Sequence, residues 1–112
     1  MELAERPDED ILEHVGSAVR EKRYRVRSHA HQHMIAEGLD ENHLVEALSG
    51  KLQLLERYDD DSRCLVLGHF HFTQRARSPL HVVCDVSNEE VVDVVTAYIP
   101  TRPWWINETH RG

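Results

Sequence analysis

The stretch that decides the fold is RCLVLGHFHFTQRARSPLHVVCDVS, residues 63–87. Its two halves, 63–72 and 79–87, alternate in a period of two, which is typical of half-buried β-strands. The polar link from Thr73 to Ser78 indicates a turn between antiparallel neighbours. The first strand should turn two sets of residues to opposite faces: Cys64, Val66, Gly68, Phe70 and Phe72 on one, and Arg63, Leu65, Leu67, His69 and His71 on the other.

Two further segments with strand character, residues 51–58 and 91–99, flank this pair. They are joined to it by the short polar links Asp59-Asp60-Asp61-Ser62 and Asn88-Glu89-Glu90. Short links between consecutive strands predict an antiparallel meander of four strands. The last strand, residues 91–99, is expected at an edge of this sheet.

The N-terminal half has helical periodicity instead. Three helices are expected: one of about four turns from Pro7-Asp8, one from Ser28 as N-cap to Gly38, and a short one from Asp40 as N-cap to Ser49-Gly50. Residues 24–27 are expected to form a short strand or an extended entry to the second helix. Helices followed by strands predict an α+β fold with two to three N-terminal helices packed on the four-stranded antiparallel sheet.

The composition fits a single domain spanning residues 1–112. No apolar run approaches the roughly 18 residues that cross a bilayer, and the N-terminus lacks the pattern of a signal peptide. Cys64 and Cys84 lie in apolar runs, so we expect two buried thiols in a reduced, cytoplasmic protein.

The net charge of −7 argues against indiscriminate binding to nucleic acid, but the basic residues are concentrated. Residues 20–33 carry five basic side chains and one acidic one, and residues 63–81 carry three arginines and no acid. These segments also hold the histidine clusters His29-Ala30-His31-Gln32-His33 and His69-Phe70-His71. Imidazoles beside guanidinium groups suit proton transfer on a compact anionic substrate.

Four short patterns, in order along the chain, resemble the bacterial domain of unknown function 4258. They are His29-Ala30 with Met34; Leu65-Val66-Leu67-Gly68; Pro79-Leu80-His81-Val82-Val83; and Val95-Thr96-Ala97-Tyr98-Ile99-Pro100 with Trp104 or Trp105 beyond. The similarity covers about residues 23–105. It implies a RelE-like fold, close to the RelE, BrnT and MqsR group of ribonuclease toxins, and an antitoxin-like protein as a partner. The chain departs from the family pattern at His33 and Glu37, where arginines usually stand, so an inactive descendant is the alternative.

The function that this resemblance implies is endoribonuclease activity without a metal. Such chemistry needs a base for the 2′-hydroxyl, an acid for the leaving oxygen, and donors for the phosphorane charge. His29 and His81 match the family pattern and are the candidates for base and acid. Arg75, Arg77 or Arg27 are the candidate cations, and Tyr98 is a candidate hydrogen-bond donor.

The alternative is a non-enzymatic, histidine-rich module that binds a metal ion or a protein. His69 and His71 with His81 on the neighbouring strand form a three-imidazole pattern that suits zinc or another transition metal. The pair His29 and His33, four residues apart on a helix, is a second possible chelate. A protein partner, either an antitoxin or a second copy of the chain, would pair with the edge strand 91–99. Trp104 and Trp105 would either anchor such an interface or cover the end of the core.

Overall fold

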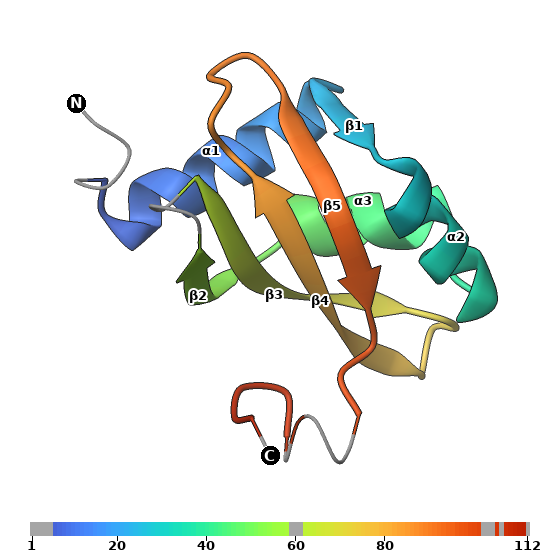
Figure 1. Ribbon diagram of the computed structural model, residues 1–112. Helices are drawn as coiled ribbons and strands as arrows, with labels where there is room; N and C mark the ends of the chain where they lie inside the picture. Colours follow the sequence, from blue (N-terminus) through green and yellow to red (C-terminus); the bar gives the residue numbers. More distant parts are fainter. Residues whose placement is uncertain (1–5, 59–61, 102–104, 106, 112) are drawn as a thin grey trace.

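The strands and helices of the chain are seen in a computed structural model, which describes residues 6–58, 62–101, 105 and 107–111 (Figure 1). The elements follow in the order α1 (Asp8–Arg20), β1 (Tyr24–Val26), α2 (Ser28–Ala36), α3 (Glu41–Ser49), β2 (Gln53–Tyr58), β3 (Arg63–His71), β4 (Arg77–Asp85) and β5 (Val92–Tyr98). The α+β class and the meander from β2 to β5 are confirmed. The turn between β3 and β4 is shorter than predicted, because β4 begins at Arg77 and not at Pro79.

The sheet is five-stranded and mixed, with the strand order β1-β5-β4-β3-β2. The prediction of four antiparallel strands was therefore wrong, because β1 pairs in parallel with β5. Main-chain bonds from Arg27 N to Val94 O (3.0 Å) and from Val92 N to Arg23 O (3.0 Å) hold β1 in place. The sheet edge expected at residues 91–99 is thus covered by β1. A three-residue strand is too short for its alternation to reveal a pairing partner 68 residues away.

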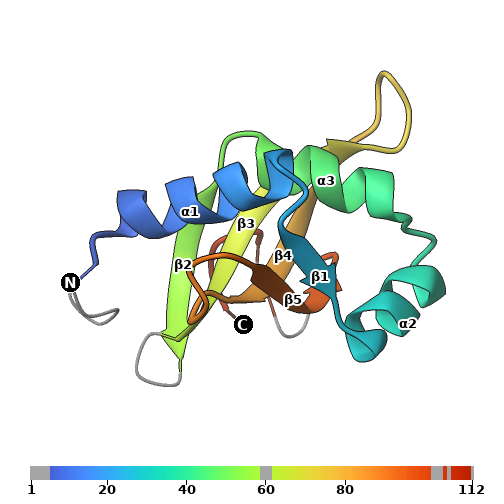
Figure 2. The same ribbon diagram turned by 90° about the horizontal axis from the view of Figure 1, so that it is seen from above.

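The helices cover one face of the sheet, as Figure 2 shows for α1 and α3. This face carries the buried residues Cys64, Val66, Phe70, Leu80, Val82 and Cys84, which pack against apolar residues of all three helices. Gly68 lets α3 approach β3 closely, because a Cβ at this position would lie 2.6 Å from the Ala47 carbonyl oxygen. The alternation of β3 and β4 therefore places the cysteines on the helix side and His81 on the opposite side, the outer face.

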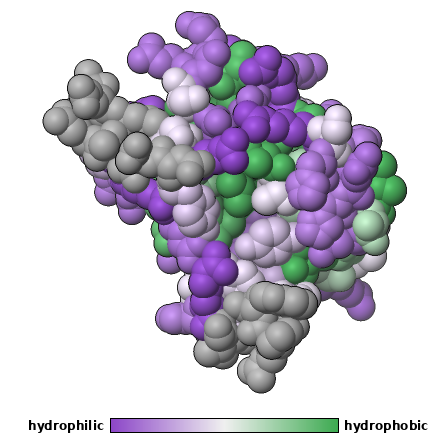
Figure 3. Space-filling view, in the orientation of Figure 1, coloured by the Kyte–Doolittle hydropathy of each residue, from purple (hydrophilic) through white to green (hydrophobic). Residues whose placement is uncertain are grey.

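The outer face of the sheet is covered at one end by the C-terminal segment, of which Trp105 and residues 107–111 are described (Figures 1 and 2). Trp105 is only 4% exposed and packs over buried residues of the outer face. It therefore covers the end of the core, and Trp104 lies outside the described residues. Apolar surface remains visible on this side of the molecule, bordered by hydrophilic residues (Figure 3).

A row of charged side chains, with two aspartates between two arginines, crosses the other end of the outer face. Arg25, Asp93, Asp85 and Arg63 are register partners on β1, β5, β4 and β3. Arg25 Nε lies 2.8 Å from Asp93, and Arg27 bonds the same carboxylate at 3.0 Å. These arginines lower the pKa of Asp93, although burial of the carboxyl group opposes them. The row ties the short strand β1 to the sheet through its side chains.

The helix boundaries largely follow the predicted caps. α3 begins with a capping box in which the Asp40 carboxylate accepts from His43 N and the His43 ring bonds back to Asp40 N. α2 differs, because Ser28 is its first helical residue and Arg27 takes the N-cap position with no side-chain cap. α2 ends at Ala36, and Gly38 just beyond it has a φ of 76°, a left-handed conformation that glycine adopts without strain. No helix in the described residues is long and apolar enough to cross a membrane.

Candidate active site

A cleft of about 340 Å³ lies between α2, the end of β5 and the C-terminal segment, and it is called the α2–β5 cleft below. It is lined by His33, Glu37, Tyr98, Ile99, Thr101, Trp105 and Arg111. His33 is half-buried in its wall and stacks with Tyr98, the ring centroids lying 6.4 Å apart. His29, one turn earlier on α2, lies 6.4 Å from the His33 ring and is exposed. Of the predicted site residues, Tyr98 lines this cleft, whereas His29 lies outside its lining and is linked to it only through the His33 ring.

His81 lies beneath the cleft and is 0% exposed. Its Nε2 is 2.6 Å from the Glu108 carbonyl oxygen, so Nε2 must carry a hydrogen and donate it. Its Nδ1 lies 3.2 Å from the Tyr98 hydroxyl and accepts from it. Burial lowers the pKa of His81, which favours this neutral form. With both nitrogens bonded and no exposed surface, His81 does not reach a substrate in the cleft.

Tyr98 connects the buried histidine to the C-terminal segment. Its hydroxyl donates to His81 and receives a hydrogen bond from the Trp105 side chain. The His81 and Trp105 rings meet edge to face with centroids 4.3 Å apart. Burial raises the pKa of Tyr98, and the bond from Trp105 opposes this only in part. Tyr98 therefore stays protonated at neutral pH and holds Trp105 over the sheet.

Arg111 supplies the cation of the cleft. Its guanidinium bonds both carboxylate oxygens of Glu56 on β2, at 2.6 and 2.7 Å, and lies 4.6 Å above the Trp105 ring. The bidentate pair raises the pKa of Arg111 and lowers that of Glu56. Tyr58 also donates a hydrogen bond to Glu56, and burial is the main cause that raises the pKa of Tyr58 to about 12. Arg111 could not be recognised from its own segment, because the residues around it have no periodic pattern.

Glu37 closes the cleft on the side of α2. Its carboxylate accepts from the main-chain N–H of Ile99 just beyond β5, at 3.1 and 3.4 Å. This contact joins the C-terminal end of α2 to β5 across the floor of the cleft. Both positions at which the chain departs from the family pattern, His33 and Glu37, therefore line the same cavity.

The predicted cations lie elsewhere. Arg75 and Arg77 are exposed at the tip of the β3–β4 hairpin, and neither lines the α2–β5 cleft. Arg27 is held by Asp93 at 3.0 Å and Asp85 at 3.6 Å. The structure thus does not bring the predicted arginines to His29 or Tyr98, because the hairpin extends β3 and β4 past the end of the cleft.

The three histidines predicted to bind zinc make separate contacts. His69 Nε2 lies 2.7 Å from the Glu108 carboxylate. His71 Nδ1 lies 2.6 Å from the Glu46 carboxylate of α3, and His81 is held as described above. In the part of the chain that the structure describes, no group of three or more His, Cys, Asp or Glu side chains is arranged to hold a metal ion.

A comparison with models of protein families identifies the family of the chain. The model of a domain of unknown function, DUF4258, matches residues 26–99, so this chain belongs to that family. The match begins at the last residue of β1 and ends just after β5, so it includes the strands β2 to β5 and both α2 and α3. No curated protein and no solved structure matches the chain significantly.

Proposed function

We propose that the chain is a toxin-like endoribonuclease that cleaves RNA without a metal ion, and that the α2–β5 cleft is its site. The observation that carries the proposal is the pair of imidazoles His29 and His33 on α2, with a centroid separation of 6.4 Å, of which His33 lines the cleft and His29 is exposed one turn before it. In this proposal they act as base and acid, and His81 is a positioning residue. The resemblance to ribonuclease toxins supplies the substrate class.

The spacing of the two rings suits in-line transfer at a phosphate. The base must reach the attacking 2′-hydroxyl and the acid the leaving oxygen, each within about 3 Å. These oxygens lie on opposite sides of the phosphorus, so the two catalytic nitrogens must be several ångströms apart. A residue four positions along a helix lies on the same face, which holds His29 and His33 at this separation.

The walls of the cleft supply the remaining groups. Arg111 lines the cleft, and its five N–H groups exceed the bonds that Glu56 and Tyr58 accept, so donors remain for a phosphate oxygen. The Tyr98 ring beneath His33 fixes one side of that imidazole.

A partner protein belongs to the same proposal. Since β1 covers β5, the strand left at the opposite edge of the sheet is β2. An antitoxin-like protein or a second copy of the chain would extend the sheet there by strand addition.

The test is cleavage of a mixed-sequence RNA by the purified chain with and without a chelator. The variants His29→Ala and His33→Ala should each lower the rate by about 10²–10⁴-fold, the usual contribution of a general acid or base. His31→Ala is the matched control, because His31 is exposed on the same helix and points away from the pair. The pH–rate profile of the parent should be bell-shaped.

Three results would contradict the proposal. Cleavage that the chelator abolishes would indicate a metal-dependent reaction. Equal loss in His31→Ala would show that the loss is not specific to His29 and His33. No cleavage by the parent under either condition would leave an inactive descendant or a binding module.

A further inference from the structure

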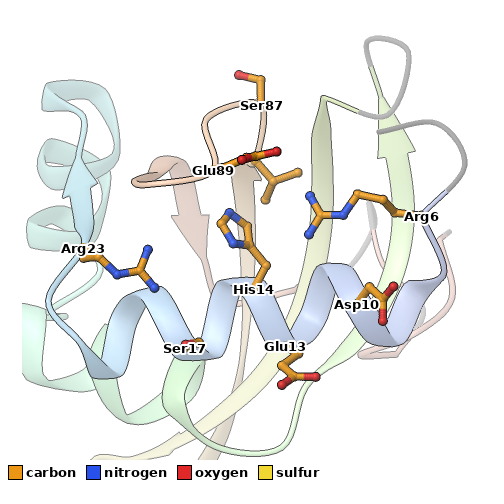
Figure 4. Close-up of a pocket in the computed structure, with 9 residues that line it drawn as sticks. Arg6, Asp10, Glu13, His14, Ser17, Arg23, Ser87 and Glu89 are labelled. Carbon is orange, nitrogen blue, oxygen red and sulfur yellow. The ribbon is translucent and has the colours of Figure 1, made fainter. Parts of the chain in front are cut away.

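A second pocket, of about 720 Å³, lies between α1 and the link that joins β4 to β5 (Figure 4). His14 on α1 points into it toward the link, where Val86, Ser87 and Glu89 form the opposite wall. The guanidinium groups of Arg6 and Arg23 extend toward the His14 ring from its two sides. This pocket lies at the start of β5, whereas the α2–β5 cleft lies at its end.

The His14 ring has one satisfied and one unsatisfied nitrogen. It donates a hydrogen bond to the main-chain carbonyl of Asn88, while its Nε2 is buried with no partner among the described residues. The donating nitrogen is therefore Nδ1, and in the neutral ring Nε2 has a free lone pair that faces no donor. A buried polar atom without a partner costs about 1–3 kcal/mol, so Nε2 is a position at which a bound group or a water molecule would stabilise the ring.

Positive and negative groups both surround His14, and they shift its pKa in opposite directions. Burial is the largest cause that lowers the pKa of His14, and the positive charges of Arg6 and, more weakly, Arg23 lower it further. The Asn88 carbonyl and the carboxylate of Glu89 act in the opposite direction. Two more carboxylates, of Asp10 and Glu13, line the pocket along α1. At neutral pH the imidazole is therefore neutral and lies between two guanidinium groups.

We propose that this pocket binds a compact oxyanion, with a phosphate group as the chemical class, held by Arg6, Arg23 and His14. Guanidinium groups match the geometry of phosphate oxygens through paired N–H donors. Arg23 already donates to the Glu90 carbonyl at 2.6 Å and to the Glu21 carboxylate, but its terminal nitrogens each have a second N–H. Arg6 reaches the pocket from the residues before α1.

His14 makes the binding depend on a proton. Nε2 can contact an anion only if a hydrogen lies between them. That hydrogen comes either from the ligand, as in monohydrogen phosphate, or from solution when the ring becomes an imidazolium. With sulfate, which carries no proton at neutral pH, only the second route is open. Phosphate should therefore bind at pH 7.5, and sulfate should bind only when the pH is lowered toward 5.5.

The experiment is a titration of the full chain with inorganic phosphate, followed through the NMR resonances of the His14 ring and by calorimetry. Arg6→Ala should weaken binding roughly tenfold, which corresponds to the loss of one charge-assisted hydrogen bond. His14→Asn keeps a donor at the position of Nδ1 for the Asn88 carbonyl and removes Nε2. It should also weaken binding and abolish the difference between pH 5.5 and 7.5 for sulfate. Lys51→Ala, which removes an exposed charge outside the pocket, is the control.

Saturable shifts of the His14 resonances in the parent, together with calorimetric binding that Arg6→Ala and His14→Asn both weaken and Lys51→Ala does not, would support the site. The absence of saturable shifts at millimolar phosphate would overturn it and leave a water molecule as the partner of Nε2. Equal binding by the parent, Arg6→Ala and His14→Asn would overturn it as well. The inference is independent of RNA cleavage, because neither His14 nor Arg6 lines the α2–β5 cleft.

Discussion

Replacing His81 with alanine removes a side chain that is wholly buried and bonded at both ring nitrogens. The cavity left by a side chain of this size costs about 2–4 kcal/mol, and the two orphaned partners, the Glu108 carbonyl and the Tyr98 hydroxyl, add about 1 kcal/mol. We expect the free energy of unfolding to fall by about 3–5 kcal/mol and the melting temperature by roughly 10–25 °C. This differs from the expectation for a catalytic histidine, whose loss leaves stability unchanged.

The assay is urea denaturation of the parent and three variants at pH 7.5. His81→Gln keeps a donor that can reach the Glu108 carbonyl, so it should be less destabilising than His81→Ala. His31→Ala, at an exposed position of α2, should change stability by less than about 0.5 kcal/mol. If His81→Ala is no less stable than His31→Ala, then His81 does not hold the C-terminal segment and the reasoning fails. If His81→Gln equals His81→Ala, the bond to Glu108 contributes nothing.

Three further predictions follow from burial and close packing. Burial lowers the pKa of both His14 and His81 from the usual 6.5. As the pH falls, these two side chains therefore take up protons at a higher pH in the unfolded chain than in the folded chain. Stability measured by urea midpoints should therefore be lower at pH 5.5 than at pH 7.5, and an equal midpoint would contradict the prediction. Burial also raises the pKa of Cys64 to about 12 and that of Cys84 well above its usual value, so both thiols should resist a disulfide reagent at pH 8 until the chain is unfolded. Gly68→Ala would place a Cβ 2.6 Å from a main-chain oxygen of α3, and it should lower stability by about 1–3 kcal/mol in thermal melts; an unchanged melting temperature would show that α3 moves away at no cost.

The sheet could be predicted from the sequence where its signal is local. The alternation in residues 63–72 and 79–87 placed Cys64 and Cys84 on the core face and His81 opposite, and the register Cys64↔Cys84 and Leu67↔His81 confirms this. The parallel strand β1 could not be placed, because its contacts with β5 join residues 68 apart in the chain. Nothing in three residues distinguishes a strand from an extended linker until the partner is known.

The site was predictable only in part, for a related reason. The spacing of His29 and His33 fixes them on one helix face, and the structure bears this out. The burial of His81 depends on Trp105 and Glu108, which lie in a segment without hydrophobic period. A residue's exposure is decided by what packs on it, so a histidine on the open face of a sheet cannot be assigned to solvent, metal or core from its own strand.

The two departures from the family pattern change the chemistry of the α2–β5 cleft in a consistent way. An arginine carries a fixed charge and only donates hydrogen bonds, whereas the neutral imidazole of His33 can donate from one nitrogen and accept at the other. Glu37 accepts from the Ile99 N–H, which an arginine cannot do, so this position fixes α2 to β5 through an acceptor. These two positions thus supply an imidazole and an anchoring carboxylate where the family pattern has two guanidinium groups. In the proposed reaction a phosphate would meet the imidazole of His33 beside the guanidinium of Arg111, so the loss of His33 would remove a proton-transfer group from the cleft while leaving its cation in place.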